Sequence, residues 1–161
     1  MKRHLDLSEE YLNDRRNGKR QARTLLKIHL EAENRGDIEG VMETFAPDVV
    51  MTYNHTEFPN PEAISAVHTY LGFSQMQGAF SPAQNVVDNV SFTETDVVVE
   101  GRMCGTHQGN FLGFEPTGNM VELPFVAMYR FEQDGKLSNE KFMMNLGPLN
   151  PDFFTAPEGL F

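Results

Sequence analysis

The stretches DVVVEGRMCGTH (residues 96–107) and NMVELPFVAMYRFE (residues 119–132) govern the fold of this chain. In each, apolar side chains recur at every second position, which is typical of a β-strand with one buried face. The intervening residues 108–118 contain two glycines and a Pro-Thr-Gly turn, which reverse the chain direction. The two stretches therefore predict neighbouring strands whose odd-numbered side chains point into the core.

Three further stretches have strand character, at residues 49–55, 85–92 and 136–145. The sequence QDGK at residues 133–136 joins the last of them to the preceding strand, and Asp-Gly is a strong signal for a tight hairpin turn. Most of the strands follow one another with short connections. The sequence therefore predicts a curved, mainly antiparallel sheet.

Helical patterns precede most of these strands. The first helix is expected at residues 22–35, with Gly36 as its C-cap residue. A short second helix should begin after the N-cap Asp37, include Phe45 and be closed by Pro47, and a third should run from the N-cap Asn60 to Gly72. Helices followed by strands predict an α+β fold with three N-terminal helices packed on the sheet.

The length of 161 residues and the apolar content of 40% fit one domain with one core. We expect a basic N-terminal extension (1–21), a folded domain (22–147) and a C-terminal tail rich in proline and phenylalanine (148–161). Three phenylalanines in this tail need apolar contacts: Phe153, Phe154 and Phe161. No apolar run is long enough for a membrane span or a signal peptide, so a cytoplasmic protein is expected.

The charge distribution limits the partners. Residues 1–27 carry a net charge of +4 and the remainder carries −14. Nucleic-acid binding needs cationic surface to neutralise phosphates, so neither nucleic acid nor a membrane is expected as a partner. The single cysteine, Cys104, excludes an internal disulfide and a zinc site built of thiolates, and is interpreted as a small strand residue.

The alternation of side chains places two histidines at the ends of buried strand faces. In residues 97–107 the odd positions are apolar until His107, and in residues 49–57 they are apolar until His55. The odd positions of residues 121–131 are apolar throughout. Together these faces predict an apolar cavity with a few polar groups at one end, the usual form of a small-molecule site.

Each histidine also has a simpler interpretation. Taken alone, His55 or His107 would be expected to face solvent or to form a hydrogen bond with the backbone. Because both histidines lie at odd positions that continue buried strand faces, we favour a single cavity that both reach. His29 and His68 lie on apolar helical faces and are expected to be core residues. A metal site that includes His55, His68, His107 and Glu57 lacks the usual ligand spacing, so no metal is expected.

A family resemblance rests on VVVEGRMCGTHQGNFLGFEPTGNMVELPFVAMYRFEQDGKL (residues 97–137). This block resembles SnoaL-like polyketide cyclases of the nuclear transport factor 2-like superfamily, which typically read G-T-H-x-G-x-x-x-G-x-x-P-T-G before a strand and an F-x-x-G-K hairpin. AENRGDIEGVMETFAPDVV (residues 32–50) is similar to the second-helix segment of that family, so the resemblance covers residues 22–147. It implies a cone-shaped, cystatin-like fold with an apolar cavity, and a homodimer.

The resemblance also implies a chemistry. Members of the family close polyketide rings by an intramolecular aldol reaction without metal or organic cofactor, using an aspartate in a pattern resembling K-I-V-E-x-W-D-x-x-D. The matching stretch here is KLSNEKFMMN (residues 136–145), which places Phe142 and Asn145 at the two aspartate positions. Neither side chain transfers a proton, so catalysis would depend on other groups.

These observations support two hypotheses. The first is a cofactor-independent cyclase, isomerase, lyase or hydrolase acting on a small, largely apolar, polyketide-like carbonyl or ester compound, with His107 as principal acid/base and His55 as a second catalytic group. The alternative is a ligand-binding or accessory protein that keeps the cavity without the chemistry. A module that interacts through its Phe-rich tail is a weaker third interpretation. The residues expected to contact substrate are Met51, Tyr53, Asn54, Met103, Phe125, Tyr129 and Asn145.

Overall fold

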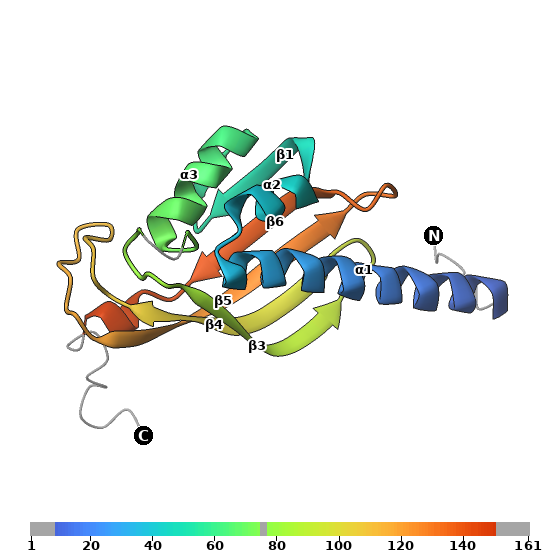
Figure 1. Ribbon diagram of the computed structural model, residues 1–161. Helices are drawn as coiled ribbons and strands as arrows, with labels where there is room; N and C mark the ends of the chain where they lie inside the picture. Colours follow the sequence, from blue (N-terminus) through green and yellow to red (C-terminus); the bar gives the residue numbers. More distant parts are fainter. Residues whose placement is uncertain (1–8, 75–76, 151–161) are drawn as a thin grey trace, which may run out of the picture.

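The computed structural model describes residues 9–74 and 77–150. Figure 1 shows three α-helices packed on one curved sheet, which confirms the predicted α+β fold. The helices are α1 (Glu9–Arg35), α2 (Ile38–Thr44) and α3 (Pro61–Leu71), with a short 3-10 helix, η1 (Gly147–Leu149), near the end of the described chain. The strands are β1 (Phe45–Tyr53), β2 (Thr56–Phe58), β3 (Gln84–Phe92), β4 (Val97–Thr106), β5 (Met120–Phe131) and β6 (Leu137–Met144).

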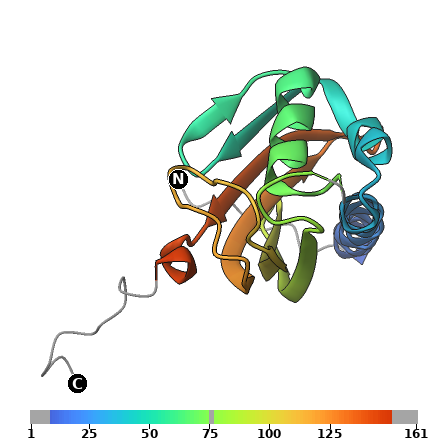
Figure 2. The same ribbon diagram turned by 60° about the vertical axis from the view of Figure 1, so that its left-hand side comes forward.

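The six strands form one sheet in the order β2-β1-β6-β5-β4-β3. Strands β1 and β6 pair in parallel, and the other four pairings are antiparallel. The prediction of a mainly antiparallel sheet is therefore confirmed. Figure 2 shows the sheet curving around the helices, which cover its concave face. The interior of the molecule lies between these two layers.

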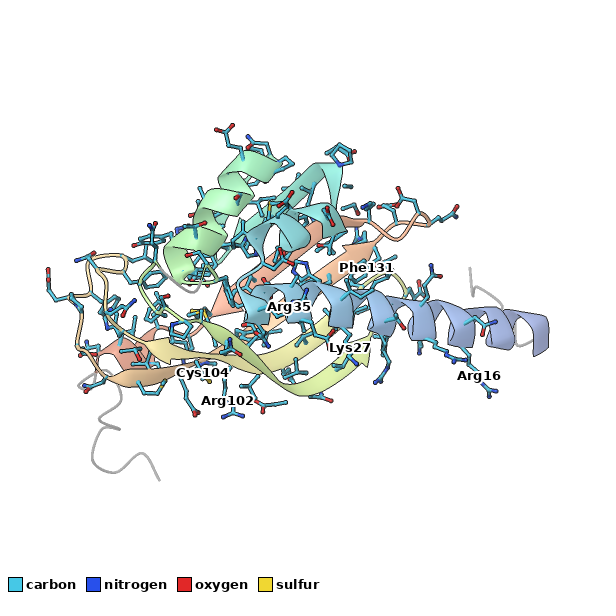
Figure 3. All side chains as sticks on the ribbon, in the orientation of Figure 1. Arg16, Lys27, Arg35, Arg102, Cys104 and Phe131 are labelled. Carbon is cyan, nitrogen blue, oxygen red and sulfur yellow. The ribbon has the colours of Figure 1, made fainter. Side chains whose placement is uncertain are left out.

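Helix α1 is longer than the sequence predicted, because it begins at Glu9 instead of Ala22. Residues 9–21 have few apolar side chains, yet most of them are good helix formers. Figure 3 shows the consequence: Arg16 lies on a part of α1 that extends beyond the sheet, whereas Lys27 lies beside it. The guanidinium of Arg23 still contacts the sheet, 5.0 Å from the centroid of the Phe92 ring. Residues 9–21 of the predicted basic extension thus continue directly into the domain as helix.

The helix ends were largely predicted correctly. Gly36 has a φ of 71° and ends α1, and the side chain of Asp37 accepts a hydrogen bond of 2.8 Å from the Gly40 amide at the start of α2. Asn60 accepts a hydrogen bond from the third residue of α3 in the same way. The predicted end of α2 was wrong: the helix stops at Thr44, and Phe45 begins strand β1 with its side chain in the core.

The strand alternation is confirmed in β4 and β5. The odd-numbered residues of β4 are buried, whereas Arg102 and Cys104 lie on the outer face, as Figure 3 shows. Arg102 forms ion pairs there with Asp88 at 2.9 Å and Glu122 at 3.0 Å.

Among the described residues, no helix has the length and apolar character that crossing a membrane would require.

Candidate functional site

An apolar cavity of about 610 Å³ lies between α3, the β1–β2 hairpin and the loop that follows β4. Its volume is in the range of small-molecule sites. It is lined mainly by aliphatic and aromatic side chains, with a few polar groups: Tyr53, Asn54, His55, Thr56, Phe58, Ala63, Ala66, Val67, Tyr70, Leu71, Phe111 and Leu112. The prediction of an apolar cavity is therefore confirmed, although its lining differs from the predicted one.

Helix α3 provides one wall because its lining residues share a face. Ala63, Ala66, Val67 and Tyr70 have the i, i+3, i+4, i+7 spacing that places side chains along one side of a helix. His68 falls on another side of α3 and points into the interior. The small alanines leave the space that the cavity occupies.

The loop after β4 is attached to α3 through Tyr70. The Tyr70 hydroxyl donates a hydrogen bond to the Asn110 carbonyl and accepts one from the Leu112 amide, both at 3.2 Å. The Tyr70 ring also stacks on Phe111, with ring centroids 5.4 Å apart. These contacts hold Phe111 and Leu112 against the cavity.

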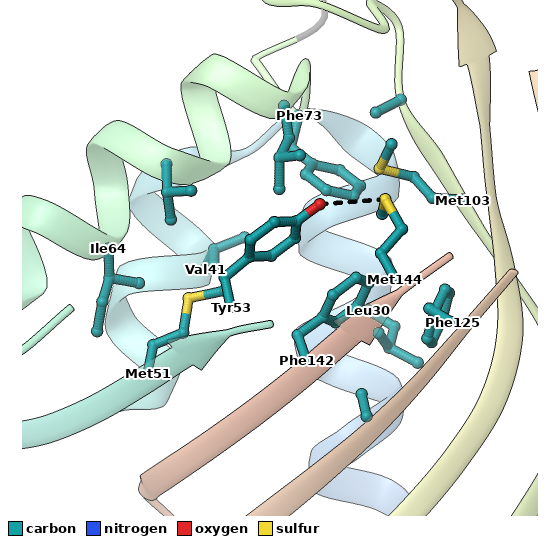
Figure 4. Close-up of a cluster of buried hydrophobic side chains, with 14 of the residues drawn as sticks. Leu30, Val41, Met51, Tyr53, Ile64, Phe73, Met103, Phe125, Phe142 and Met144 are labelled. Carbon is teal, nitrogen blue, oxygen red and sulfur yellow. Dashed lines mark hydrogen bonds between the residues drawn. The ribbon is translucent and has the colours of Figure 1, made fainter. Parts of the chain in front are cut away.

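Tyr53 lies at the end of β1 and brings a buried hydroxyl to the cavity wall. Figure 4 shows this hydroxyl directed at Met144, where it donates to the thioether sulfur at 3.2 Å. A thioether is a weak acceptor. Burial raises the pKa of Tyr53, so the hydroxyl keeps its proton. Tyr53 is therefore a donor that loses little if it turns to a ligand oxygen.

His55 lines the cavity from an exposed position. The prediction that it ends a buried strand face was wrong, because β1 stops at Tyr53 and Asn54 turns the chain with a φ of 54°. The side chain of Asn54 accepts a hydrogen bond of 2.9 Å from the Met144 amide, which fixes this turn. His55 consequently stands at the rim of the cavity.

His107 is buried and does not line the cavity. Its ring stacks on Phe80 at 5.1 Å, and Phe80 contacts the edge of Phe111 at 4.8 Å. Phe111 in turn lines the cavity, so two aromatic rings separate it from the imidazole. Within the described chain, neither ring nitrogen of His107 has a hydrogen-bond partner.

The reason for this placement is the segment 77–83, which the sequence did not place. The parity of His107 was predicted correctly, but this segment covers the end of β4. A Cβ atom on Gly105 would collide with the Phe80 carbonyl oxygen, so only glycine admits such a close approach. The predicted convergence of His55 and His107 on one cavity is therefore wrong.

The other predicted contact residues are divided between core and rim. Four of them are buried and do not line the cavity: Met51, Met103, Phe125 and Tyr129. Asn145 lines a neighbouring hollow of about 310 Å³ together with Asn54 and His55. Its side-chain oxygen accepts a hydrogen bond from the Gly147 amide, so it also stabilises the start of η1. Phe142 is buried and stacks on both Tyr53 and Phe125.

A second group of ionisable side chains lies deeper, between α1, α3 and β6. We call it the inner cluster; it consists of His29, Glu33, His68 and Glu140, all buried. His68 Nε2 lies 3.0 Å from Glu33 Oε1. His29 Nε2 lies 3.6 Å from the same oxygen and 3.8 Å from Glu140 Oε2. Buried carboxylates need such compensation, because leaving them unpaired costs several kcal/mol.

Burial and neighbouring charges shift the pKa values of three members of the inner cluster. Burial raises the pKa of Glu33, but the nearby His29 and His68 outweigh it and lower the value to about 2. Burial lowers the pKa of His68, and the hydrogen bond and charge of Glu33 overcome this and raise it to about 9. Burial raises the pKa of Glu140. Glu33, His68 and Glu140 therefore have pKa values that depend on their neighbours in the cluster.

Only half of this cluster was predictable from the helical patterns. His29 and His68 were expected in the core, and they are buried there. Glu33 was missed although it follows His29 by four residues, a spacing that places both on one face of α1. Glu140 was missed too, and strict alternation from Leu137 would have given the wrong face, because the register of β6 shifts after that residue.

The sequence and the fold of this chain are both similar to those of known proteins. Residues 27–140 match the SnoaL-like domain, and the chain belongs to this family. Among solved structures, it is similar to a proposed SnoaL-like polyketide cyclase from Jannaschia sp. CCS1, with 22% identity, a TM-score of 0.68, and coverage of 85% of this chain and 94% of the other. The resemblance of the sequence to this family is thus confirmed.

Two further solved structures are similar to this chain. AclR, a proposed hydroxylase from Streptomyces galilaeus, shares 27% identity with a TM-score of 0.67 and covers 86% of this chain and 83% of its own. IdmH, a proposed polyketide cyclase from Streptomyces antibioticus, shares 25% identity with a TM-score of 0.65 over 80% and 95% of the two chains. No curated protein matches this sequence.

Proposed function

We propose that this chain is a cofactor-independent enzyme of the cyclase or isomerase type, acting on a small, largely apolar carbonyl or ester compound. The substrate would occupy the cavity beside α3. The observation that carries the proposal is Tyr53, a buried residue of the cavity lining whose hydroxyl donates, within the described chain, to a thioether sulfur alone. An apolar wall with a few polar groups, among them this weakly bound donor, favours a ligand that carries a carbonyl on a hydrocarbon body.

The chemistry needs a base for the proton next to the carbonyl and a donor for the oxygen that becomes negative. Tyr53 supplies the donor, since its raised pKa keeps it protonated. His55 supplies the base, because it is the one histidine among the described residues that line the cavity. This assignment replaces His107, which lies behind the rings of Phe80 and Phe111.

The competing function is binding without chemistry. It is favoured by Phe142, whose phenyl ring fills the place where the resembling family has an aspartate and packs against Tyr53 with ring centroids 5.8 Å apart. In that case the cavity would still take up the same class of compound. The difference between the two functions lies in proton transfer alone.

Exchange of deuterium into 1-tetralone, an aromatic ketone with acidic protons beside its carbonyl, tests the proposal without the natural substrate. The wild-type chain should accelerate the exchange measured by NMR in heavy water. His55→Asn should reduce the protein-catalysed rate by about 10²- to 10⁴-fold, and Tyr53→Phe by about 10²- to 10³-fold. The exposed and unrelated variant Glu62→Gln serves as the control and should retain the full rate.

Each outcome separates the hypotheses. Binding of the ketone without accelerated exchange would establish the binding function and refute the enzymatic one for this class of carbonyl compound. Acceleration that survives in His55→Asn but is lost in folded His107→Asn would return the role of base to His107. Neither binding nor exchange would reject both functions for ketones of this kind.

A further inference from the structure

We infer that the inner cluster is a binding site for a divalent zinc-like cation, held by His29, Glu33, His68 and Glu140. This inference is independent of the function proposed for the cavity. The four side chains come from α1, α3 and β6, which are distant in sequence. A cation among them would therefore join both helices to the sheet.

The hydrogen bonds fix which nitrogen of each imidazole faces the cluster. His68 Nδ1 lies 2.8 Å from the Ile64 carbonyl, which can only accept, so this nitrogen carries a proton. His29 Nδ1 lies 2.7 Å from the Thr44 hydroxyl, and that hydroxyl donates to the Val41 carbonyl. His29 Nδ1 must therefore donate as well. In the neutral state both rings consequently direct an Nε2 lone pair at the carboxylates.

Lone pairs and carboxylate oxygens repel one another unless a positive charge lies between them. Within the described chain, His29 Nε2 and Glu140 Oε2 have no hydrogen-bond partner although both side chains are fully buried. These two atoms face each other at 3.8 Å. The arrangement of an imidazole that donates through one nitrogen to backbone or hydroxyl and offers the other is typical of metal ligands.

The distances suit a small cation. Ligand atoms of a tetrahedral zinc site with bonds of about 2.0 Å lie about 3.3 Å apart. The distances from Glu33 Oε1 to His68 Nε2 and His29 Nε2 are 3.0 and 3.6 Å, on either side of that value. One ligand atom each from His29, His68 and Glu140 lie within 4.8 Å of one another. Glu33 is not in this set of three, so coordination by all four side chains requires one of the two carboxylates to move toward the other.

The composition and burial of the cluster indicate the class of metal and its role. Two imidazoles and two carboxylates are ligands that zinc accepts. Two negative carboxylates with two neutral imidazoles balance one divalent charge. The side chains are at most 3% exposed, which leaves no open coordination position, as in structural zinc sites. Asn85 Nδ2 donates to the outer oxygen of Glu33 at 2.7 Å and so orients this ligand.

The test uses the full chain without an affinity tag. The protein is stripped with a chelator, incubated with zinc chloride, desalted and analysed for metal content. We expect one zinc ion per chain, and a melting temperature that rises by about 5–10 °C when free zinc exceeds its dissociation constant a hundredfold. Cobalt in place of zinc should give the visible absorption of a tetrahedral site.

Variants distinguish this site from surface binding. Glu140→Gln should weaken zinc binding at least tenfold, and Thr44→Ala, which removes the partner of His29 Nδ1, should weaken it by about 10- to 100-fold. The matched control is Glu31→Gln, an exposed carboxylate two residues before Glu33 on α1; it should bind like wild type. A wild-type chain that retains no zinc and melts unchanged overturns the inference, whether or not the variants fold. Equal binding by all variants overturns it too.

Discussion

The stability of the metal-free protein should fall as the pH rises from 6.5, because the proton held by His68 is then lost. Its pKa is about 9 in the folded chain against an ordinary value of 6.5. The folded state binds this proton more tightly, so the stabilisation is fully present below pH 6.5 and disappears as the pH rises through about 9. Glu33 provides it, with smaller effects of Glu140.

The magnitude follows from the two pKa values. The difference between about 9 and 6.5 corresponds to about 3 kcal/mol in total. About 2 kcal/mol of this should be lost between pH 6.5 and about pH 8.5. The lowered pKa of Glu33 reflects the same ion pair with His68, so this shift adds nothing further to the stabilisation of about 3 kcal/mol. The range ends near pH 8.5 because an unfolded cysteine, with an ordinary value of 9.0, begins to titrate there.

The assay is urea denaturation at several pH values in this range, with a chelator present throughout. His55→Asn removes an exposed imidazole and should leave the pH dependence unchanged. Glu33→Gln should remove most of it, since His68 then lacks its main charged partner. A free energy of unfolding that stays constant from pH 6.5 to about pH 8.5 in the wild-type protein would refute the coupling between Glu33 and His68.

Three substitutions test other parts of the structure. Gly105→Ala should lower the free energy of unfolding by about 1–3 kcal/mol in urea titrations, because its Cβ collides with the Phe80 carbonyl; Gly18→Ala, in open space on α1, should not destabilise. Phe142→Asp should lower the free energy of unfolding by at least about 3 kcal/mol in the same assay, since it removes a buried ring and buries a carboxyl group. It should not accelerate deuterium exchange into the ketone, and a stable, more active variant would contradict this. Arg102→Ala should leave the urea midpoint of unfolding close to that of the wild type, because its ion pairs with Asp88 and Glu122 lie on the surface and are screened by solvent; a clear fall of the midpoint would contradict this.

The regular elements were predictable because their signals are local. Asn60 and Pro61 mark the start of α3, and the alternation of β4 and β5 gives their buried faces. These patterns depend on neighbouring residues alone. The family could be identified from the same region, since its motif coincides with β4 and the turn that follows.

The site was less predictable because it depends on how distant segments meet. Alternation was extended to His55, one residue past the left-handed turn at Asn54, and so placed it on the wrong face. His107 was placed on the correct face, but nothing local indicated that Phe80 would cover it. The inner cluster joins Glu33 to His68, 35 residues apart, by a hydrogen bond that no spacing rule announces.

Binding of 1-tetralone to isotope-labelled protein, followed by NMR, tests whether the cavity beside α3 is the ligand site. The resonances that shift most should belong to Ala63, Val67 and Leu71, which line the cavity on α3. Ala63→Trp places a large ring in the cavity and should abolish the shifts, whereas Glu62→Trp, at a neighbouring exposed position outside the lining, should preserve them. Shifts confined to other regions, or binding that persists in a folded Ala63→Trp protein, would contradict the assignment of this cavity as the ligand site.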